Sequence, residues 1–332
     1  MLKIDISKKF KDIPEENPGI DIPESKEKED GKKNRKESLI KALSFLKDNY
    51  PLKYNEITQE TYVKIKGQWV YFDDRMYHDL KVQLDLSGIP LSDSSYNNIV
   101  KGSIITSTFN PLKDYLKSLP KVDKDANYID NLCSHLHLLD ESRRGYVNRV
   151  FKKWFVGMVG SIIEPGKPNH LCVVLVGDQN NGKTTFLNNL VPEHLRTDYL
   201  YSNTFLPHDK DHRLFLATKL LINLDEMEVF NRVDIRTIKS VMTVDKVVLR
   251  KAYGRTTTTS PRIASFCGSV NNPEFLSDET GTRRWVPIGV QRADFHIDKS
   301  LLDNCYAQAV ELYRDKDYKH YIEPEDMKEL EN

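Results

Sequence analysis

Residues 171–190 read LCVVLVGDQNNGKTTFLNNL. An apolar run, Leu171–Val176, is followed at once by a glycine-containing segment and then by a helix-forming one. Short apolar runs bounded by polar or turn residues are typical of buried parallel strands. Two further runs of this kind, Lys219–Leu224 and Ile263–Ser269, follow in the chain. The sequence therefore predicts an α/β fold with a central parallel sheet.

The segment after the first strand fits the pattern G-x-x-x-x-G-K-[ST]. Its glycines let the backbone curl so that N–H groups face phosphate oxygens, Lys183 supplies positive charge to the β- and γ-phosphates, and the Thr184 hydroxyl is a Mg²⁺ ligand. A chance glycine-rich turn is the alternative, but the strand before and the helix after are the context that the motif requires. We expect ATP and Mg²⁺ as cofactors, with the nucleotide held by Gly177, Asp178, Gln179, Asn180, Asn181, Gly182, Lys183, Thr184 and Thr185.

Two acidic residues, Asp225 and Glu226, follow the second strand. We expect Asp225 to hold Mg²⁺ together with Thr184, and Glu226 to orient and deprotonate the water that attacks the γ-phosphate. A kinase does not need a second carboxylate dedicated to water, whereas a hydrolase does. The alternative is a strand end capped by solvated acids, but the neighbouring phosphate-loop motif favours ATP hydrolysis.

The third strand leads into Asn271. In P-loop ATPases of this class, a third strand places a polar residue between the two motifs, where it can hydrogen-bond the attacking water. We expect Asn271 to take this catalytic role. The alternative is that Asn272-Pro273 forms a simple turn.

Two arginines, Arg283 and Arg284, stand just before Trp285. An arginine at a subunit edge can reach the γ-phosphate of a neighbouring subunit and stabilise transition-state charge. Either arginine is a candidate for this catalytic role. The alternative is that both are surface residues stacked on Trp285.

A basic segment lies between the acidic pair and Asn271. Residues 246–262 contain five basic residues and no acidic one, with an aromatic residue and several hydroxyls among them. This composition is typical of a loop that grips a nucleic-acid backbone and stacks on a base. A solvated hairpin is the alternative. The candidate DNA-binding residues are Lys246, Arg250, Lys251, Tyr253 and Arg255.

Composition narrows the function classes. The 49 basic and 49 acidic residues give zero net charge, so any nucleic-acid contact must come from a local basic cluster. The four cysteines form no C-x-x-C pair, which argues against a zinc site or a disulfide framework. No apolar signal segment or 18-residue apolar run occurs, so we expect a cytoplasmic protein without membrane contact.

The domain organisation follows from these patterns. We expect a disordered charged tail over residues 1–37, a mostly helical domain over 38–164, the ATPase domain over 165–292 and a helical extension over 293–332. Within the second segment, Tyr62–Ile65 and Trp69–Tyr71 flank Lys66-Gly67 as in a β-hairpin. Apolar residues at helical spacing predict an amphipathic helix from Val147 to Ile162.

Several stretches together resemble the virulence-associated E (VapE) family of phage, plasmid and genomic-island proteins, which are similar to superfamily 3 helicases of the AAA+-like class. The resemblance covers about residues 40–290 and is carried by residues 109–119, 171–190, 223–228, 247–255, 266–276 and 281–287.

The resemblance implies a P-loop NTPase that forms a hexameric ring, hydrolyses ATP between subunits and contacts DNA through a pore loop at 246–255. No primase or origin-binding segment is recognisable, so we expect priming to need a separate protein. The function expected is an ATP-dependent DNA helicase or translocase in replication of a mobile element or phage. The alternative is an ATPase switch that assembles on a partner protein without unwinding DNA.

Overall fold

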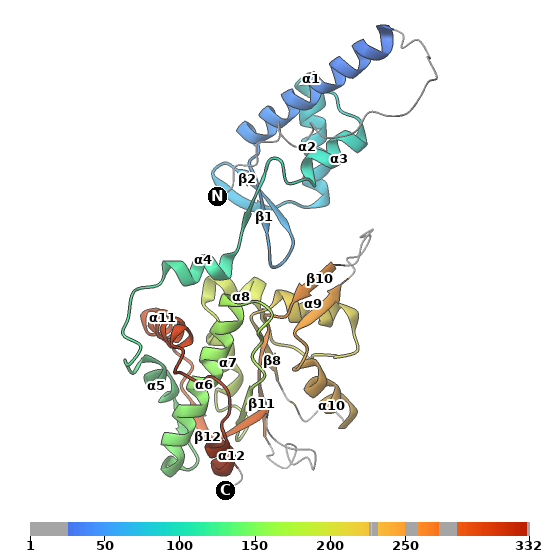
Figure 1. Cartoon of the computed structure of the whole chain (residues 1–332). Coiled ribbons are helices and arrows are strands. Elements are labelled where there is room, and N and C mark those ends of the chain that lie inside the picture. The colour runs from blue at the N-terminus through green and yellow to red at the C-terminus, as the bar shows by residue number, and fades with distance from the viewer. Residues whose placement is uncertain (1–25, 226, 228–231, 250–257, 272–283, 331–332) are drawn as a thin grey trace. The chain divides into compact units, whose positions relative to one another are not determined.

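The computed structural model describes residues 26–225, 227, 232–249, 258–271 and 284–330 (Figure 1). The chain forms two compact units. The N-terminal unit contains the described residues up to Lys53 together with Tyr62–Ser107, and the larger unit contains Tyr54–Thr61 and the residues from Thr108 onward. The chain therefore passes between the units within strand β1, at the start of β2 and within β4.

The N-terminal unit combines helices with a β-hairpin around a small core that includes Leu46, Val63 and Tyr96. The predicted hairpin is confirmed, and its turn residues Lys66 and Gly67 both have positive φ, as two-residue hairpins prefer. The elements of this part of the chain are α1 (Lys26–Asn49), β1 (Leu52–Asn55), β2 (Thr61–Ile65), β3 (Gln68–Tyr71), α2 (Asp74–Leu86), α3 (Asp93–Val100) and β4 (Thr106–Phe109).

A six-stranded sheet organises the larger unit, in the order β5-β12-β6-β11-β8-β7. All neighbouring strands are parallel except β5, which pairs antiparallel with β12. The three predicted strands are confirmed as β6, β8 and β11. The strands are β5 (Leu136–Leu138), β6 (Cys172–Val176), β7 (Leu200–Tyr201), β8 (Leu221–Leu224), β11 (Ser265–Val270) and β12 (Trp285–Ala293).

Helices cover both faces of this sheet (Figure 1). One face carries Val173 and Leu175 and packs against α6, α7 and α11, while the other carries Val174 and packs against α9 and α10. The helices are α4 (Pro111–Ser118), α5 (Tyr128–Cys133), α6 (Arg144–Ile163), α7 (Lys183–Asn189), α8 (Glu193–Tyr199), α9 (Lys210–Thr218), α10 (Arg232–Val241), α11 (Lys299–Arg314) and α12 (Pro324–Leu330). A 3-10 turn, η2 (Glu141–Arg143), precedes α6, and a hairpin of β9 (Lys246–Leu249) and β10 (Thr258–Pro261) follows α10.

The division of the chain differs from the expected one. Residues from Thr108 onward fall in one compact unit, which includes residues on both sides of 164/165 and of 292/293. The reason is that α6 is buried along most of its length and packs against both the sheet and α11, with its Trp154 Nε1 donating to the Phe266 carbonyl in β11. At the other end, α1 begins at Lys26, so residues 26–37 are helical because Lys, Glu and Arg are good helix formers.

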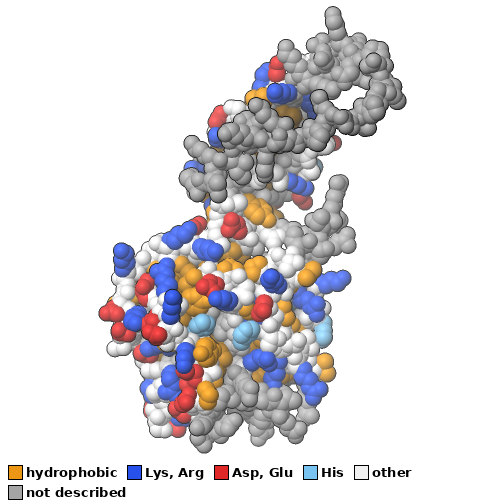
Figure 2. All heavy atoms as spheres, in the orientation of Figure 1, with side chains coloured by type: hydrophobic (Ala, Val, Ile, Leu, Met, Phe, Trp, Pro, Cys, Tyr) orange, Lys and Arg blue, Asp and Glu red, His pale blue; other side chains and the backbone are white. Residues whose placement is uncertain are grey.

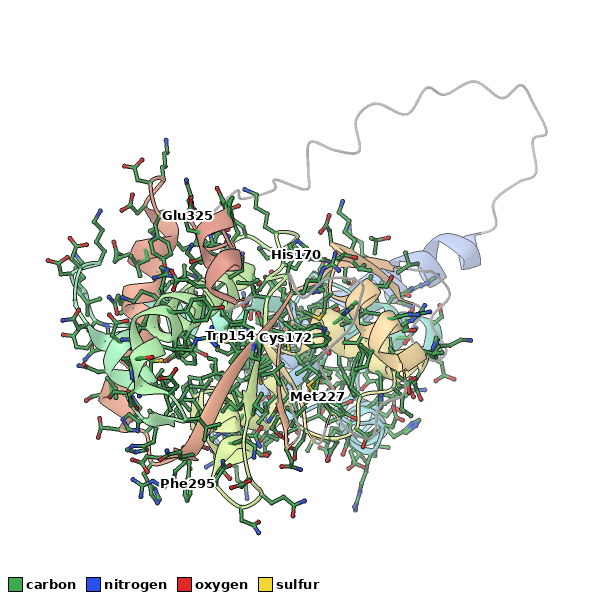
Figure 3. All side chains as sticks on the ribbon, turned by 90° about the horizontal axis from the view of Figure 1, so that it is seen from below. Trp154, His170, Cys172, Met227, Phe295 and Glu325 are labelled. Atoms are coloured by element: carbon green, nitrogen blue, oxygen red, sulfur yellow. The ribbon has the colours of Figure 1, made fainter. Side chains whose placement is uncertain are left out.

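An ion-pair cluster attaches α12 to α6. The Asp326 side chain is buried and accepts from Lys153 Nζ at 2.6 Å and from Arg149 Nε at 2.8 Å. Glu323 also accepts from Lys153, at 2.9 Å. In Figure 3, Glu325 of α12 lies near the top of the view and Phe295, which follows β12, lies near the bottom, so α12 and the segment after β12 are well separated. None of the described helices is long and apolar enough to span a bilayer.

Candidate active site

The carboxyl ends of β6, β8 and β11 meet at one edge of the sheet, because the three strands are parallel neighbours. Ligands of open α/β sheets bind at this edge. The loop of residues 177–182 follows β6, Asp225 follows β8, and Asn271 follows β11. A pocket of about 320 Å³ lies there, lined by Gln179, Asn180, Asn181, Gly182, Lys183, Thr184, Thr185, Asp225, Ser269 and Asn271.

The loop packs tightly against the end of β12. A Cβ on Gly177 would collide with the Val290 carbonyl oxygen, and one on Gly182 would collide with the Ala293 carbonyl oxygen. Gly182 also has a φ of 88°, in the left-handed region. The Asn181 carbonyl accepts from the Ala293 N–H at 2.8 Å. Both glycines of the motif are therefore required by a close approach of backbone to backbone.

Lys183 is a buried cation within the pocket, with 6% of its surface exposed. Its Nζ donates to the carbonyl oxygens of Gly177 and Asp178, both at 2.6 Å, and to Asn181 Oδ1 at 3.1 Å. These acceptors are all within six residues of the lysine. The loop thus holds a positive charge beside the first turn of α7, whose leading N–H groups have no partner within the helix.

Two hydroxyls converge on one carboxylate oxygen. Asp225 Oδ1 accepts from Thr184 Oγ1 at 2.7 Å and from Ser269 Oγ at 2.6 Å. These oxygen donors fit a small, hard divalent cation, which prefers carboxylate and hydroxyl oxygens. Sequence reasoning singled out Thr184 and Asp225 but missed Ser269. The available signal was that Ser269 is a small hydroxyl residue next to the carboxyl end of a predicted buried strand.

A buried hydrogen bond between two asparagines holds α7 against β8. Asn223 in β8 is fully buried, and its Nδ2 donates to Asn188 Oδ1 in α7 at 2.9 Å. Since Asn223 lies two residues before Asp225, this bond ties the strand that carries the carboxylate to the helix that carries Lys183 and Thr184. Buried amides need such partners, so the pair restricts how the two elements can slide.

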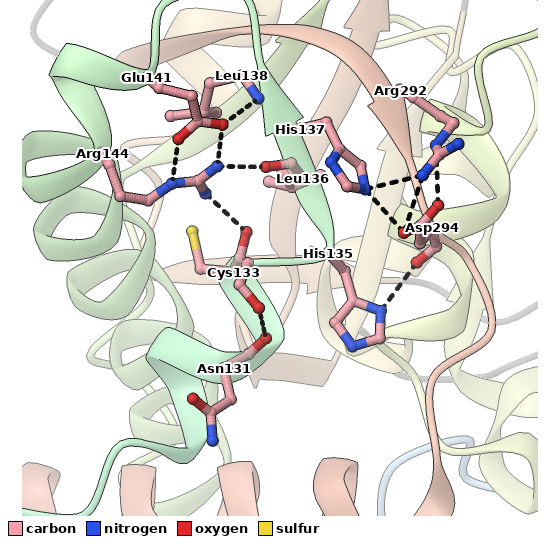
Figure 4. Close-up of polar contacts among 11 residues, drawn as sticks. Asn131, Cys133, His135, Leu136, His137, Leu138, Glu141, Arg144, Arg292 and Asp294 are labelled. Carbon is pink, nitrogen blue, oxygen red and sulfur yellow. Dashed lines mark hydrogen bonds and ion pairs between the residues drawn. The ribbon is translucent and has the colours of Figure 1, made fainter.

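A polar network joins β5 to the end of β12 (Figure 4), one residue beyond Ala293, whose N–H bonds to Asn181 of the loop. His137 Nε2 lies 2.8 Å from Asp294 Oδ2, and Arg292 Nε pairs with Asp294 Oδ1 at 3.0 Å. The hydrogen bond with His137 lowers the pKa of Asp294, and Arg292 acts in the same direction. Arg144 donates to the Leu136 carbonyl and to Glu141. Both ends of the short strand β5 are thereby anchored.

A comparison with known families decides the classification. The family described as virulence-associated protein E-like domain matches residues 116–332, more than half of the chain. The chain belongs to the virulence-associated protein E-like (VapE-like) family. The resemblance found in the sequence is thus confirmed, and the matched region contains every residue of the pocket.

Solved structures share the fold of this VapE-like chain. The apo structure of the NrS-1 C-terminal region (305–718) superposes with a TM-score of 0.51 at 15% identity, covering 89% of this chain and 74% of that one. The A form apo structure of the NrS-1 C-terminal region gives a TM-score of 0.51 at 15% identity, covering 86% and 72%. At this identity the likeness concerns the fold alone. No curated protein matches the chain.

In this VapE-like chain, Arg284 and the pocket lie at opposite ends of strand β6. The Arg284 carbonyl oxygen accepts from the Cys172 N–H at 2.8 Å, at the amino end of β6, whereas the loop follows the carboxyl end. The strand between them is five residues long. Contact between the Arg284 side chain and a γ-phosphate would therefore need a neighbouring subunit.

The basic segment has two described ends. Lys246 begins β9 and is exposed, and β9 pairs with β10 as a hairpin. Arg262, one of the five basic residues counted there, is fully buried, so it does not contribute to a DNA surface. Six other candidate residues lie outside the described residues: Glu226, Arg250, Lys251, Tyr253, Arg255 and Arg283.

Proposed function

We propose that the pocket at the carboxyl edge of the six-stranded sheet binds ATP with Mg²⁺ and hydrolyses it, as in a P-loop NTPase. The observation that carries this proposal is the convergence of Lys183, Thr184, Asp225, Ser269 and Asn271 from three strand ends on one pocket. The glycine-rich backbone and the lysine suit polyphosphate, and the oxygen cluster suits a divalent cation.

Each residue then has a distinct task. Lys183 exchanges its loop carbonyls for the β- and γ-phosphates, and Thr184 and Asp225 hold Mg²⁺ with Ser269 orienting the carboxylate. Bound Mg²⁺ supplies charge neutralisation on the phosphate oxygens. Glu226 orients and deprotonates water, and Asn271 hydrogen-bonds it. Arg283 or Arg284 stabilises the transition state from a neighbouring subunit.

The work done by hydrolysis is, in this proposal, movement along DNA during replication of a mobile element or phage. Family membership supports this role. A hexameric ring would bring an arginine to each neighbour's pocket and would place the basic segment, including Lys246, around a single strand.

Hydrolysis assays test the proposal. Purified protein should hydrolyse ATP in the presence of Mg²⁺, and added single-stranded DNA should raise the rate. Lys183→Ala should abolish hydrolysis, because the β- and γ-phosphates lose their point charge. Lys316→Ala, which removes an exposed lysine far along the chain, is the matched control and should keep wild-type turnover. Normal turnover by Lys183→Ala would remove the pocket from consideration.

A second candidate is an ATPase switch that assembles on a partner protein. Two observations favour it: the net charge is zero, and Arg262 is withdrawn from the basic segment into the core. In the view of Figure 2, Lys and Arg side chains are interspersed with Asp and Glu rather than gathered in one patch. ATP hydrolysis that ignores DNA but responds to a captured protein would establish the switch.

Mixing experiments test the role of the arginines. A protein with both Arg283→Ala and Arg284→Ala should hydrolyse ATP poorly by itself. Mixed with Lys183→Ala subunits it should regain activity, because intact arginines then face intact pockets. If mixed assemblies form and no activity returns, the arginines do not act across an interface.

A further inference from the structure

A second cavity lies beside the phosphate loop and shares no lining residue with the candidate active site. Its volume is about 920 Å³. Small ligands typically bind in cavities of about 300–1,000 Å³ that combine apolar walls with a few polar groups. The end of α7, the first turn of α8, the segment after β12 and the first turn of α11 form its wall, which includes Asn189, Pro192, His194, Phe295, Ile297 and Leu302.

Phe295 joins this cavity to the loop. Its Cδ1 lies 3.1 Å from the position that a Cβ on Gly182 would take, so the ring packs against the glycine that precedes Lys183. The Phe295 side chain is nevertheless 37% exposed, and its ring centre lies 4.8 Å from that of His296. An exposed aromatic ring thus stands at the point where the loop ends and the cavity begins.

The backbone that carries Phe295 is held on three sides. The Ala293 N–H donates to the Asn181 carbonyl at 2.8 Å, and the Asp294 N–H donates to the His135 carbonyl at 2.9 Å. The Phe295 carbonyl accepts from Asn189 Nδ2, in the last turn of α7, at 2.7 Å. A ring on such an anchored segment is in place before a ligand arrives, which lowers the entropy that binding costs.

The two cavities lie along one helix. The pocket of the candidate active site includes Lys183 and Thr184 in the first turn of α7, and the second cavity reaches Asn189, the last residue of that helix, about 10 Å further along. A nucleotide carries its phosphates at one end and its base at the other, so a single ligand can enter both.

We propose that the second cavity binds the base of the nucleotide, which stacks on the Phe295 ring. Stacking on an aromatic side chain is a strong and common way to hold a base. The inference rests on the proposed function, because it assumes that phosphates occupy the loop. It adds the part of the ligand that the loop motif does not contact.

Other roles of Phe295 give different outcomes. If the ring only supports Gly182, its removal distorts the loop and weakens every ligand that contains phosphates. If the ring belongs to an interface with a neighbouring subunit, its removal changes the oligomeric state and leaves nucleotide affinity as it was. Base stacking alone makes the loss depend on whether the ligand has a base.

Mg²⁺-ADP and Mg²⁺-pyrophosphate, titrated separately into the full chain in a calorimeter, distinguish these roles. Phe295→Ala should weaken ADP binding roughly 5- to 150-fold, the range expected for one stacked base, and leave pyrophosphate binding unchanged. Lys183→Ala should weaken both ligands. Tyr321→Ala, which removes a more exposed ring between α11 and α12, is the matched control and should affect neither.

A conservative variant supplies a spectroscopic readout. Phe295→Trp keeps a flat ring at the same place and should retain the ADP affinity of the wild type. Stacking of the base should quench the added tryptophan, whereas pyrophosphate should not. Wild-type protein, which has its other three tryptophans but none at this position, gives the background signal.

Three results would overturn the inference: wild-type ADP affinity in Phe295→Ala, an equal loss of ADP and pyrophosphate binding in that variant, and unchanged Phe295→Trp emission when ADP binds. Failure of the proposed function looks different, because wild-type protein would then bind neither ADP nor pyrophosphate, and the inference would fall with it. Wild-type protein that binds both ligands, with ADP affinity unchanged in Phe295→Ala, would overturn the base site alone.

Discussion

Two buried cations lie at opposite ends of the same strand, and their partners differ in origin. Lys183, beyond the carboxyl end of β6, bonds to acceptors within six residues of itself. Arg262, near the amino end, donates to the neighbouring Ala264 carbonyl oxygen, but also to those of Val241, Met242 and Asn169, which belong to distant segments. Local partners can be given up for a ligand without opening the fold, whereas distant partners hold segments together.

The surroundings of Arg262 support this reading. Its guanidinium donates to carbonyl oxygens at the C-terminal end of α10 and to the carbonyl oxygen of Asn169, which precedes β6. Asn169 in turn donates to the Trp154 carbonyl in α6. Burial lowers the pKa of Arg262 to about 9, so the group is still charged at neutral pH. The cation thus fastens the base of the β9–β10 hairpin to the core.

The largest effect is expected for Arg262→Met. The substitution keeps an unbranched apolar side chain but removes the guanidinium bonds to the Ala264 and Asn169 carbonyls. Each buried carbonyl left without a donor costs about 1–3 kcal/mol. We expect the free energy of unfolding of the larger unit to fall by at least about 3 kcal/mol, measured by urea denaturation. A decrease of less than about 1 kcal/mol in the free energy of unfolding would mean that Arg262 does not hold these segments together.

A smaller effect is expected from ATP on the wild-type protein. At a concentration a hundredfold above its dissociation constant, bound ATP should raise the free energy of unfolding by about 2.7 kcal/mol. Lys183→Met should show no such gain at the same concentration. Equal stabilisation of both proteins by ATP would show that the nucleotide binds elsewhere.

Lys153, a third buried cation, has carboxylate partners, so its contribution to the free energy of unfolding depends on pH. Burial alone raises the pKa of Asp326, but hydrogen bonds from Lys153 and Arg149 outweigh it, and the pKa is lowered overall. Asp326→Asn should lower the free energy of unfolding by about 2 kcal/mol at neutral pH, since Lys153 keeps Glu323. A lowered carboxyl pKa stabilises above its ordinary value of 3.8, so the difference between the two proteins should vanish as pH falls below it.

The smallest effect is expected for the intrinsic stability of Lys183→Met. Without nucleotide, the hydrogen bonds of Lys183 Nζ to Gly177, Asp178 and Asn181 are local to the loop. We therefore expect the free energy of unfolding to change by less than about 1 kcal/mol. Urea denaturation of the two proteins side by side measures it. A loss as large as that of Arg262→Met would erase the distinction between the two cations.

The sequence predicted the strands whose apolar runs are continuous, namely β6, β8 and β11, and the residues that follow them. It did not predict β12, because Pro287 and Gly289 argue against a central strand. The structure explains the exception. The Arg284 carbonyl faces β6 and the Gly289 carbonyl faces β5, so Pro287 faces the β5 side, and β5 pairs only with Val290–Ala293. The N–H that Pro287 lacks would therefore point to a stretch of β12 where β5 makes no hydrogen bonds.

The candidate site was predicted where the motif is contiguous and missed where it depends on folding. Residues 177–184 are recognisable by spacing alone. Ser269 and Asn188 gain their roles from register and packing, which bring them to Asp225 and Asn223 from 44 and 35 residues away.

The position of β12 sets the order in which the molecule can be completed during synthesis. The loop at 177–182 rests on the carbonyls of Val290 and Ala293, which are translated more than 100 residues later. At about 5–20 residues per second, roughly ten seconds separate the two. A nascent chain that has made only the loop lacks the wall against which it folds. Competence to bind a ligand there therefore arrives late, after residue 293 has left the ribosome.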